Sequence, residues 1–270
     1  MSAEEQYQKG EAYFNGVKSG NSISKDYSKA FEWYQKAALR GHPLAQCQLG
    51  LLYREGHGIP KDEKQAFEWF MKAAQTDQNC PRGKFYVGRC YERGTGISRN
   101  LAEAIRWYSI AAEQGDAYAQ INLGLCYKFG DGVQQNFSEA VRLFTMAATE
   151  GDALALCNLG LLYKEGKGVP KDVDVALDLI SKSANQGEPY GQLELGYWYW
   201  RGDVCKRNPS QAFSWFQKAA EQGDEEAQER LGYCYEKGEG IDHNPAQAIY
   251  WYEKAANGGL ASAMTILGYC

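Results

Sequence analysis

The sequence predicts an all-α repeat fold in which pairs of antiparallel helices stack into a solenoid. The main observation is a hydrophobic residue followed by glycine, which recurs as Leu49-Gly50, Val87-Gly88, Leu123-Gly124, Leu159-Gly160, Leu195-Gly196, Leu231-Gly232 and Leu267-Gly268. From Gly88 onward the step between copies is always 36 residues. A fixed period of this length indicates one supersecondary unit that can bury its apolar face only by stacking on its neighbours.

The first two steps are longer, at 40 and 38 residues, when Lys9-Gly10 is taken as a divergent first copy. Four extra residues therefore fall near Ser19 to Ser24, and two fall near Gln78 to Arg82. We expect both insertions to lie between helices, because there they leave the register of the other copies intact. Residues 1–270 are expected to form one array.

Residues 43–55 illustrate the first helix of each unit. Ala45, Leu49 and Tyr53 recur at four-residue intervals, which is the spacing of one helical stripe. Glycine then ends the helix, because a left-handed residue is least strained as glycine. The predicted stops are Gly56, Gly94, Gly130, Gly166, Gly202 and Gly238.

Residues 62–74 illustrate the second helix, with Ala66, Phe70 and Ala73-Ala74 at helical spacing. An Asp or Asn marks each start, because its side chain can accept a hydrogen bond from an unpaired backbone amide. The predicted N-caps are Asp26, Asp62, Asn100, Asn136, Asp172, Asn208 and Asn244.

The hinge glycine lies inside the predicted first helix, where glycine costs about 1 kcal/mol relative to alanine. We infer that close packing between the two helices of a unit offsets this cost. The opposing surface is predicted to be the paired alanines of the second helix, such as Ala73-Ala74 and Ala111-Ala112.

These patterns resemble the Sel-1-like repeats, which are relatives of the tetratricopeptide repeats. The motif A-x-A-Q-x-x-L-G-x-x-Y-x-x-G-x-G-V, followed by A-x-x-W-Y-x-K-A-A-E-Q-G, covers nearly the whole chain. The copies span approximately residues 3–41, 42–79, 80–115, 116–151, 152–187, 188–223 and 224–259, with a half repeat at 260–270. The resemblance implies a right-handed superhelix of seven repeats plus a final single helix. It also implies a non-enzymatic adaptor or scaffold that binds proteins on a concave surface lined by the first helices.

The eight cysteines lack the pattern of disulfide-stapled secreted relatives, which carry two cysteines per repeat at constant spacing. Here only the third copy holds a pair, Cys80 and Cys90. Equivalent cysteines in different copies lie about one repeat apart, whereas the alpha carbons of a disulfide must lie within about 7 Å. We therefore interpret the cysteines as thiols, which are typical of a reducing compartment.

No pattern indicates a catalytic site, a metal site or a cofactor. His42, His57 and His243 lie in separate predicted loops without the spacing of zinc ligands, and we interpret them as solvated. Ser22 and Lys25 fit the S-x-x-K motif of penicillin-recognising enzymes. They lie in the first insertion, and the S-D-N and K-T-G motifs of that class do not accompany them.

Composition argues against nucleic acid and membrane as partners. The net charge is −5, whereas a nucleic-acid-binding domain usually carries a basic excess. The start, MSAEEQYQKG, has no apolar core of signal-peptide length, and no apolar run is long enough to span a bilayer. We expect a cytoplasmic protein with a protein or peptide partner.

Helical geometry predicts which side chains of the first helices face away from the second helices. At about 100° per residue, the positions five and two before the hinge hydrophobic residue, and two, five and six after it, share this outer face. Its aromatic and arginine side chains are of the types that dominate binding hot spots. The predicted partner-binding residues are Arg82, Phe85, Arg89, Arg93, Tyr118, Lys128, Phe129, Lys164, Tyr190, Tyr197, Trp200, Arg201 and Tyr233. For Tyr197, packing against a neighbouring first helix stays an open alternative.

Charge is unevenly distributed on this predicted face. The basic side chains are Arg82, Arg89, Arg93, Lys128 and Lys164, and the acidic side chains of a later copy are Glu226, Glu229 and Glu236. We predict that an acidic or C-terminal-carboxylate segment of a partner protein lies across copies three to five. The alternative is an ordinary solvated face.

Three classes of function stay open. The first is an adaptor, the second is the regulatory or targeting part of a larger enzyme such as a kinase, and the third is a penicillin-recognising hydrolase. The second rests on the position of Cys270, midway through a first-helix pattern. The last helix is then either a cap of the array or the point at which a longer natural protein continues. The oligomeric state is not predicted.

Overall fold

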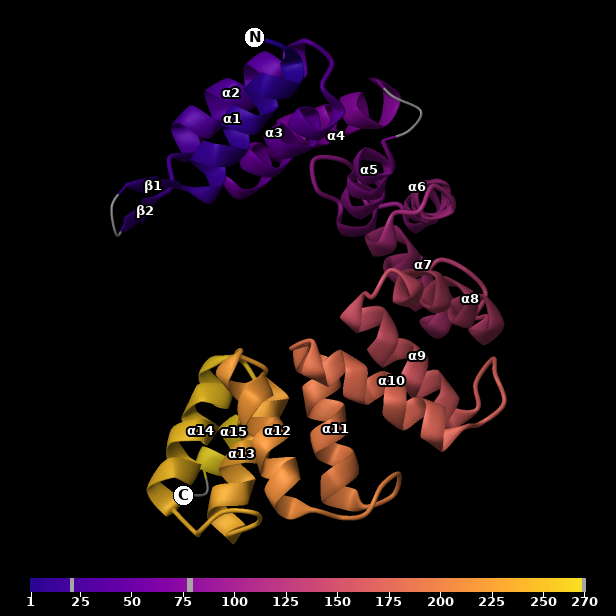
Figure 1. Cartoon of the computed structure of the whole chain (residues 1–270), viewed down its shortest axis with the longest axis vertical. Coiled ribbons are helices and arrows are strands. Elements are labelled where there is room, and N and C mark those ends of the chain that lie inside the picture. Colours follow the sequence, from indigo (N-terminus) through magenta and orange to yellow (C-terminus); the bar gives the residue numbers. More distant parts are fainter. Residues whose placement is uncertain (20–21, 77–79, 269–270) are drawn as a thin grey trace. The chain divides into compact units, whose positions relative to one another are not determined.

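The computed structural model describes residues 1–19, 22–76 and 80–268. Within these ranges fifteen α-helices follow one another along the chain (Figure 1). The first helices of the repeats are α1 (Ala3–Asn15), α3 (Pro43–Glu55), α5 (Pro81–Arg93), α7 (Ala117–Phe129), α9 (Ala153–Glu165), α11 (Pro189–Arg201), α13 (Glu225–Lys237) and α15 (Ala261–Gly268). The second helices are α2 (Tyr27–Leu39), α4 (Glu63–Thr76), α6 (Leu101–Glu113), α8 (Phe137–Thr149), α10 (Val173–Asn185), α12 (Pro209–Glu221) and α14 (Pro245–Asn257). The predicted all-α class is confirmed.

The insertion in the first copy forms a small β-hairpin between α1 and α2. Strand β1 (Val17–Ser19) pairs antiparallel with β2 (Ser22–Ser24), and Val17 lies opposite Ser24. The hairpin lies between helices, as predicted, and is the one local departure from helix pairs among the described residues. The second insertion, near Gln78 to Arg82, falls partly outside the described residues, as does Cys270.

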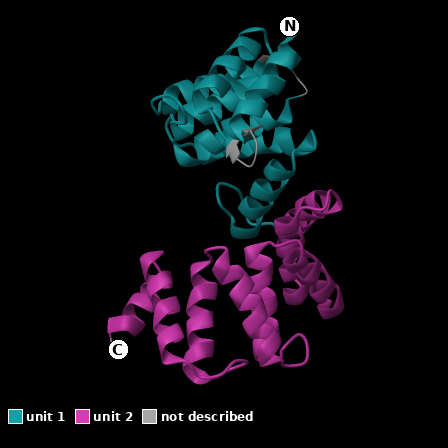
Figure 2. Cartoon of the chain, turned by 60° about the vertical axis from the view of Figure 1, so that its left-hand side comes forward, with its two compact units in different colours: residues 1–136 teal, residues 137–270 magenta. Residues whose placement is uncertain are grey.

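Contacts within the chain divide it into two compact units, Met1–Asn136 and Phe137–Cys270 (Figure 2). In unit 1 each helix from α1 to α7 packs against the next, and in unit 2 each helix from α8 to α15 does the same. The first helices α3 and α5 also touch, as do α9 and α11. Within each unit this is the contact pattern of a helix-pair solenoid.

A large side chain of the second helix lies over the hinge glycine in six repeats, at Gly10, Gly50, Gly88, Gly160, Gly196 and Gly232. A Cβ built on Gly50 would lie 2.6 Å from Cδ1 of Phe70, and a Cβ built on Gly196 would lie 2.7 Å from Cδ1 of Phe216. These separations are far below van der Waals contact, so any side chain at the hinge would displace the ring. The prediction of close packing is confirmed, but the predicted partner, the paired alanines, is wrong.

The paired alanines instead face the first helix of the next repeat. A Cβ built on Gly83 of α5 would lie 2.9 Å from Cβ of Ala73 and 2.8 Å from the backbone nitrogen of Ala74. Other repeats place a fully buried alanine at the position of Gly83, such as Ala119 or Ala227. Small residues therefore serve two different interfaces, one within a repeat and one between repeats.

A buried glutamine adds a hydrogen bond between successive repeats. The side-chain amide of Gln46 in α3 donates to the carbonyl of Ala38, in the last turn of α2, at 3.1 Å. Gln192 in α11 donates in the same way to Ala184 of α10 at 3.2 Å. The last carbonyls of a helix have no partner inside it, so this bond satisfies a group that the interface buries.

Helix ends follow the predicted signals. The predicted N-caps whose side chains accept a backbone N–H are Asp26, Asp62, Asn100, Asp172, Asn208 and Asn244. In the loop after α5, Gly94 ends the helix with a left-handed φ of 75°. Gly96, two residues on, lies against the backbone of Glu63 at the start of α4, where no Cβ would fit. The two glycines of this loop are therefore needed for different reasons, Gly94 for its left-handed backbone and Gly96 for the close approach of a neighbouring helix.

In three repeats the side chain over the hinge glycine is tyrosine, and its hydroxyl donates to a glutamate of the first helix. Tyr108 donates to Glu92 at 2.9 Å, and Tyr252 donates to Glu236 at 2.8 Å. Burial, followed by the nearby carboxylate, raises the pKa of both phenols above the ordinary value of about 10. The folded state therefore holds these hydroxyls protonated.

Replacing the hinge glycine should destabilise the fold. In Gly50→Ala the new methyl group overpacks against the Phe70 ring, at a cost of about 1–3 kcal/mol. A gain in helix propensity of about 1 kcal/mol offsets part of this cost. We expect a net loss in the free energy of unfolding, measured by urea denaturation followed by far-UV circular dichroism.

The double variant Gly50→Ala/Phe70→Ile is the matched control, because the fifth repeat naturally places Ile180 over its hinge Gly160. The smaller side chain makes room for the methyl group, so the double variant should lose less stability than the sum of the two single variants. Strictly additive losses, or a stabilised Gly50→Ala, would contradict the ring contact.

Alkaline pH should destabilise the fold through the buried tyrosines. Folding raises the pKa of Tyr108 above that of the unfolded chain. The contribution of Tyr108 to the free energy of unfolding is therefore complete below a pH of about 10. It is lost as the pH rises further, because the unfolded state then releases a proton that the folded state retains. Tyr108→Phe is less stable than the parent at neutral pH but lacks this loss. The stability gap between the two proteins should narrow from pH 9 to pH 11, measured by urea denaturation; a constant gap would refute the coupling.

Candidate partner-binding surface

The thirteen predicted partner-binding residues all lie on first helices, but they occupy both units. In unit 1, α5 carries Arg82, Phe85, Arg89 and Arg93, and α7 carries Tyr118, Lys128 and Phe129. In unit 2, α9 carries Lys164, α11 carries Tyr190, Tyr197, Trp200 and Arg201, and α13 carries Tyr233.

Four of the predicted residues in unit 2 gather into one aromatic–arginine cluster, which we define as Tyr197, Trp200, Arg201, Arg230 and Tyr233. The Trp200 ring meets Tyr233 edge to face, with ring centroids 6.0 Å apart at 86°, and it meets Tyr197 at 6.4 Å and 62°. The guanidinium carbon of Arg201 lies 4.8 Å from the Tyr197 ring centroid. This geometry is that of favourable aromatic pairs and cation–π contacts.

Arg230, which the sequence analysis did not include, joins the cluster from α13. Its Nε donates to the Tyr197 hydroxyl at 2.9 Å, and its guanidinium carbon lies 5.5 Å from the same ring centroid. Arg230 is next to the hinge Leu231 and was not assigned to the outer face. Little in the sequence predicts that Arg230 joins this cluster, because its contact with Tyr197 depends on α11 and α13 lying side by side.

Two carboxylates hold the cluster in place. The Tyr197 hydroxyl donates to Glu226, and the Trp200 indole Nε1 donates to Oε2 of Glu239 in the loop after α13. Arg207 bonds the other Glu239 oxygen at 3.2 Å. The Trp200 side chain is therefore fixed in one orientation while remaining partly exposed.

Burial separates the predicted residues into contact candidates and core. Tyr197 is 6 % exposed and packs edge to face on Phe216, so the open alternative for Tyr197, core packing, is confirmed. Phe85 is only 2 % exposed, and the expectation that its ring reaches a partner is wrong. Its ring lies between Tyr108 and Tyr118, at centroid distances of 5.9 and 5.7 Å.

Arg82 also has a structural role. Its Nε donates to Oδ2 of the buried Asp116 at 2.8 Å, and its guanidinium carbon lies 4.3 Å from the Tyr118 ring centroid. Asp116 is the N-cap of α7 and accepts the amide of Ala119 through its other oxygen. Arg82 thus neutralises a buried cap, and it is not available as a cation for a partner.

Lys164 is likewise paired within its own unit. Its Nζ lies 3.3 Å from Oδ2 of Asp203 and 5.0 Å from the Trp198 ring centroid. The predicted continuous basic stripe is therefore interrupted by internal partners at both Arg82 and Lys164.

Arg89 and Arg93 remain as basic side chains of α5 that have no hydrogen bond or ion pair among residues 1–19, 22–76 and 80–268. Arg89 is half-buried, with its guanidinium carbon 5.8 Å from the Phe85 ring centroid, and Arg93 is exposed one turn further along. Burial, and then the positive charges of Arg93 and Arg54, lower the pKa of Arg89. Arg54 belongs to α3, which packs against α5.

Two aromatic rings of α7 are open to solvent. Tyr118 is 50 % exposed and Phe129 is 61 % exposed. Large apolar side chains of this exposure are available for contact. Tyr190 and Tyr233 are partly buried, and Arg201 is exposed.

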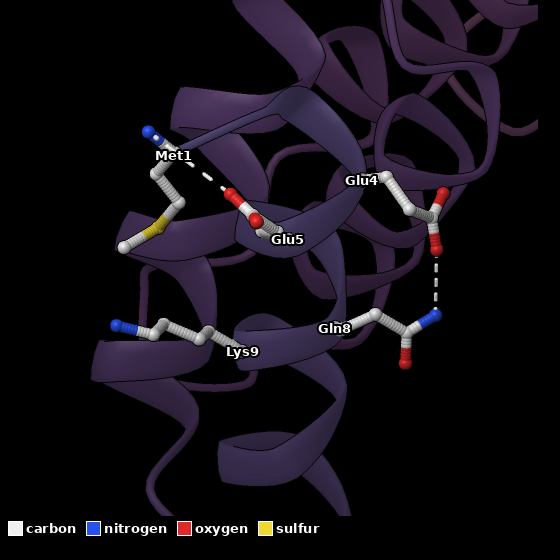
Figure 3. Close-up of a pocket in the computed structure, with 5 residues that line it drawn as sticks. All are labelled: Met1, Glu4, Glu5, Gln8 and Lys9. Atoms are coloured by element: carbon white, nitrogen blue, oxygen red, sulfur yellow. Dashed lines mark hydrogen bonds and ion pairs between the residues drawn. The ribbon is translucent and has the colours of Figure 1, made fainter.

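A surface hollow beside α1 measures about 630 Å³ (Figure 3). Met1, Glu4, Glu5, Gln8 and Lys9 line it. Gln8 donates to Glu4 at 2.7 Å, and the amino terminus lies 4.0 Å from Glu5. These two contacts are separate, and the side chains involved do not converge on a common point.

The described metal-ligating side chains are dispersed, and most of the described cysteine thiols are buried. Among the described residues, no three His, Cys, Asp or Glu side chains gather to hold a metal ion. The seven cysteines in these ranges are thiols, as predicted. Burial raises the pKa of Cys90, Cys126 and Cys234 to about 12, which keeps them protonated and poor nucleophiles.

The histidine prediction holds for two of three residues. His57 and His243 are exposed. His42 is not a solvated loop residue, because its Nδ1 accepts the amide of Ala45 at 3.2 Å as the N-cap of α3, and its ring stacks on Tyr7 at 4.6 Å. A histidine N-cap is rare enough that the Asp and Asn signals of the other repeats did not suggest it.

The S-x-x-K segment lies at the hairpin. Ser22–Ser24 is strand β2, and Lys25 follows it. Extended backbone separates residues three apart by about 10 Å, whereas a nucleophile and its base must lie within hydrogen-bond reach. The backbone here does not bring Ser22 and Lys25 together.

Comparison with known families identifies the repeat. The model described as Sel1 repeat matches residues 6–42, 43–75, 81–116, 117–152, 153–188, 189–224 and 225–260. The chain belongs to the Sel1 repeat family. Proteins of this family are generally protein-interaction modules, and their repeat scaffold is typically non-catalytic.

Solved Sel1 repeat structures are similar over most of the chain. A protective antigen of uropathogenic Escherichia coli, c5321, displays an SLR fold and is 34 % identical over 99 % of this chain and 56 % of its own, with a TM-score of 0.72. A Sel1 repeat protein from Oxalobacter formigenes is 34 % identical over 85 % of this chain and 91 % of its own, with a TM-score of 0.77. This chain thus spans little more than half the length of the antigen.

A more distant match shares the fold alone. The immunity protein Pa5087 from Pseudomonas aeruginosa is 20 % identical over 96 % of this chain and 83 % of its own, with a TM-score of 0.54. A search of curated proteins found no match. None of the helices within the described ranges combines the length and apolar character that a membrane span requires.

The role of Arg82 can be tested by stability. Arg82→Ala leaves the carboxylate of Asp116 buried without its cation, so we expect a loss of about 1–3 kcal/mol in the free energy of unfolding. Arg93→Ala, on the same helix, is the matched control and should change stability by less than about 0.5 kcal/mol. Chemical denaturation measures both. A neutral Arg82→Ala would return Arg82 to the list of contact candidates.

Proposed function

We propose that this Sel1 repeat protein is a non-enzymatic adaptor that holds a segment of a partner protein on the outer face of its first helices. The observation that carries the proposal is the aromatic–arginine cluster of unit 2. It combines tryptophan, tyrosine and arginine, the types most enriched at binding hot spots, within two adjacent first helices.

The fixed geometry of the cluster supports this role. Ordering a flexible side chain on binding costs about 0.5–1.5 kcal/mol, and a side chain that is already fixed avoids most of that cost. Trp200 is held by Glu239 and by the edge of Tyr233, yet part of its surface remains open. A partly exposed, pre-oriented indole is a suitable anchor for an apolar side chain of a partner.

The compartment is part of the proposal. Thiols at all seven described cysteines are typical of a reducing environment, so we place the protein in the cytoplasm. Within each unit, a concave surface lined by the first helices, as the family resemblance implies, is likewise part of the proposal.

Trp200→Ala should weaken capture of the partner. The intact chain is used as bait in a lysate of its source organism, captured proteins are identified by mass spectrometry, and the affinity of the purified partner is then measured by calorimetry. Loss of a hot-spot tryptophan costs about 2 kcal/mol or more, so we expect Kd to rise by about 30-fold or more.

Trp215→Ala is the matched control, because it removes the same side chain from the second helix α12 of the same unit. The control should retain the parent affinity. If Trp215→Ala weakens binding and Trp200→Ala does not, the partner uses the second helices and the proposed face is wrong. Failure to capture any partner at bait saturation would count against the adaptor function itself.

A further inference from the structure

We propose that Arg54, Arg89 and Arg93 form an anion-binding patch in unit 1, and that its occupant is an acidic segment of a partner protein. The inference rests on the proposed function, because it assigns the chemistry of a partner to one part of the first-helix face. It differs from the basic stripe predicted by sequence, since it leaves out Arg82 and adds Arg54 from the preceding repeat.

The three arginines lie on two first helices, α3 and α5, that pack side by side, and the positive charges of Arg54 and Arg93 act on Arg89. Arg89 and Arg93 are one turn apart on α5, and Arg54 is in the last turn of α3. The guanidinium carbon of Arg54 lies 6.0 Å from the Tyr86 ring centroid, and that of Arg89 lies 5.8 Å from the Phe85 ring centroid. The rings beneath them limit the solvent that reaches two of the three cations.

The protein neutralises this patch only in part. Arg89 and Arg93 have no acidic partner in the described part of the chain, and Arg54 has only the exposed Glu55, at 2.7 Å from its Nε. The carboxylate of Glu92 accepts the Tyr108 hydroxyl, and its negative charge offsets part of the repulsion that Arg89 experiences from Arg93 and Arg54. The lowered pKa of Arg89 has the same physical origin, which is burial together with repulsion from Arg93 and Arg54.

Helix dipoles explain part of the arrangement but not all of it. Arg54 and Arg93 lie in the last turns of their helices, where a positive charge is favourable. Arg89 lies a full turn earlier and is half-buried, so the dipole does not offset its desolvation or the repulsion from its neighbours. An anion seated between the three groups would remove that repulsion.

A short carboxylate-rich segment fits this patch better than a nucleic acid does. The guanidinium fork matches a carboxylate with two parallel hydrogen bonds, and three cations suffice for a few acidic side chains. The chain as a whole carries a net charge of −5, which opposes the approach of a long polyanion. The patch is therefore a local positive site on a negatively charged protein.

The test uses the full chain and a fluorescein-labelled peptide rich in Glu and Asp with a single Leu, followed by fluorescence anisotropy at low ionic strength. A second peptide carries Gln and Asn in place of the acids. We expect the acidic peptide alone to bind, and Arg89→Glu/Arg93→Glu to raise its Kd by about tenfold or more, because two favourable charge contacts become repulsive. Melting temperature should stay within about 2 °C of the parent, since neither arginine has a hydrogen bond or ion pair to lose among the described residues.

Lys36→Glu/Arg106→Glu is the matched control, because it makes the same change in net charge on second helices of the same unit, at exposed positions. This control should bind the acidic peptide within about twofold of the parent. Equal losses in both double variants, or equal binding of the amide peptide, would overturn the patch as a specific site. Displacement of the peptide by inorganic phosphate or by a single-stranded oligonucleotide, with tighter binding than the peptide itself, would also overturn the assigned occupant.

The outcome is separable from that of the adaptor proposal. Capture of a partner that depends on Trp200, together with no binding of the acidic peptide, would reject the patch and leave the adaptor function standing. Peptide binding that depends on Arg89 and Arg93, with no partner captured by the intact chain, would keep the patch and reject the adaptor function.

Discussion

The close contact between the hinge glycine and a large side chain of the second helix determines the rest of each repeat. Because a ring or branched chain lies directly over Gly50 or Gly196, the two helices of a repeat can pack in only one rotational setting. That setting fixes which side of the first helix is inside. The outer face, and therefore the residues offered to a partner, follows from the helical period alone.

The same contact links the core to the chemistry of the surface. In the third and seventh repeats the side chain over the glycine is tyrosine, its hydroxyl needs an acceptor, and the outer position five residues after the hinge hydrophobic residue is glutamate, Glu92 or Glu236. Where it is phenylalanine, no acceptor is needed, and the same position holds Arg54 or Trp200. A phenylalanine at this site thus leaves the position five residues after the hinge hydrophobic residue free to hold a cation or an indole. Both proposed contact regions use such a position.

Sequence reasoning predicted the local features well and the contacts between repeats poorly. Helix bounds, N-caps and glycine stops depend on residues close in the chain, and these were largely correct. Phe85 was misplaced because a helical wheel treats one helix, whereas Tyr118 of the next first helix covers the ring. Arg82 was misassigned for a similar reason, since its carboxylate partner, Asp116, lies 34 residues along the chain. Arg54 joins Arg89 only through the packing of α3 on α5, which no local pattern encodes.

The two contact regions differ in how far their polar and charged groups have partners within the protein, and this difference bears on their roles. In unit 2, Glu226 and Glu239 accept the polar hydrogens of Tyr197 and Trp200, so the cluster is ordered before a partner arrives. Its contribution to binding is then shape and apolar area, which act mainly on the lifetime of a complex.

In unit 1, Arg89 and Arg93 form no ion pair with the described residues and their charges are only partly offset, so a partner of opposite charge gains from the first approach. Unneutralised surface charge acts mainly on the association rate and on the choice of partner. An adaptor that recognises acidic character through one region and an apolar anchor through the other would need both features in one partner, and this requirement is a source of specificity that neither region provides alone.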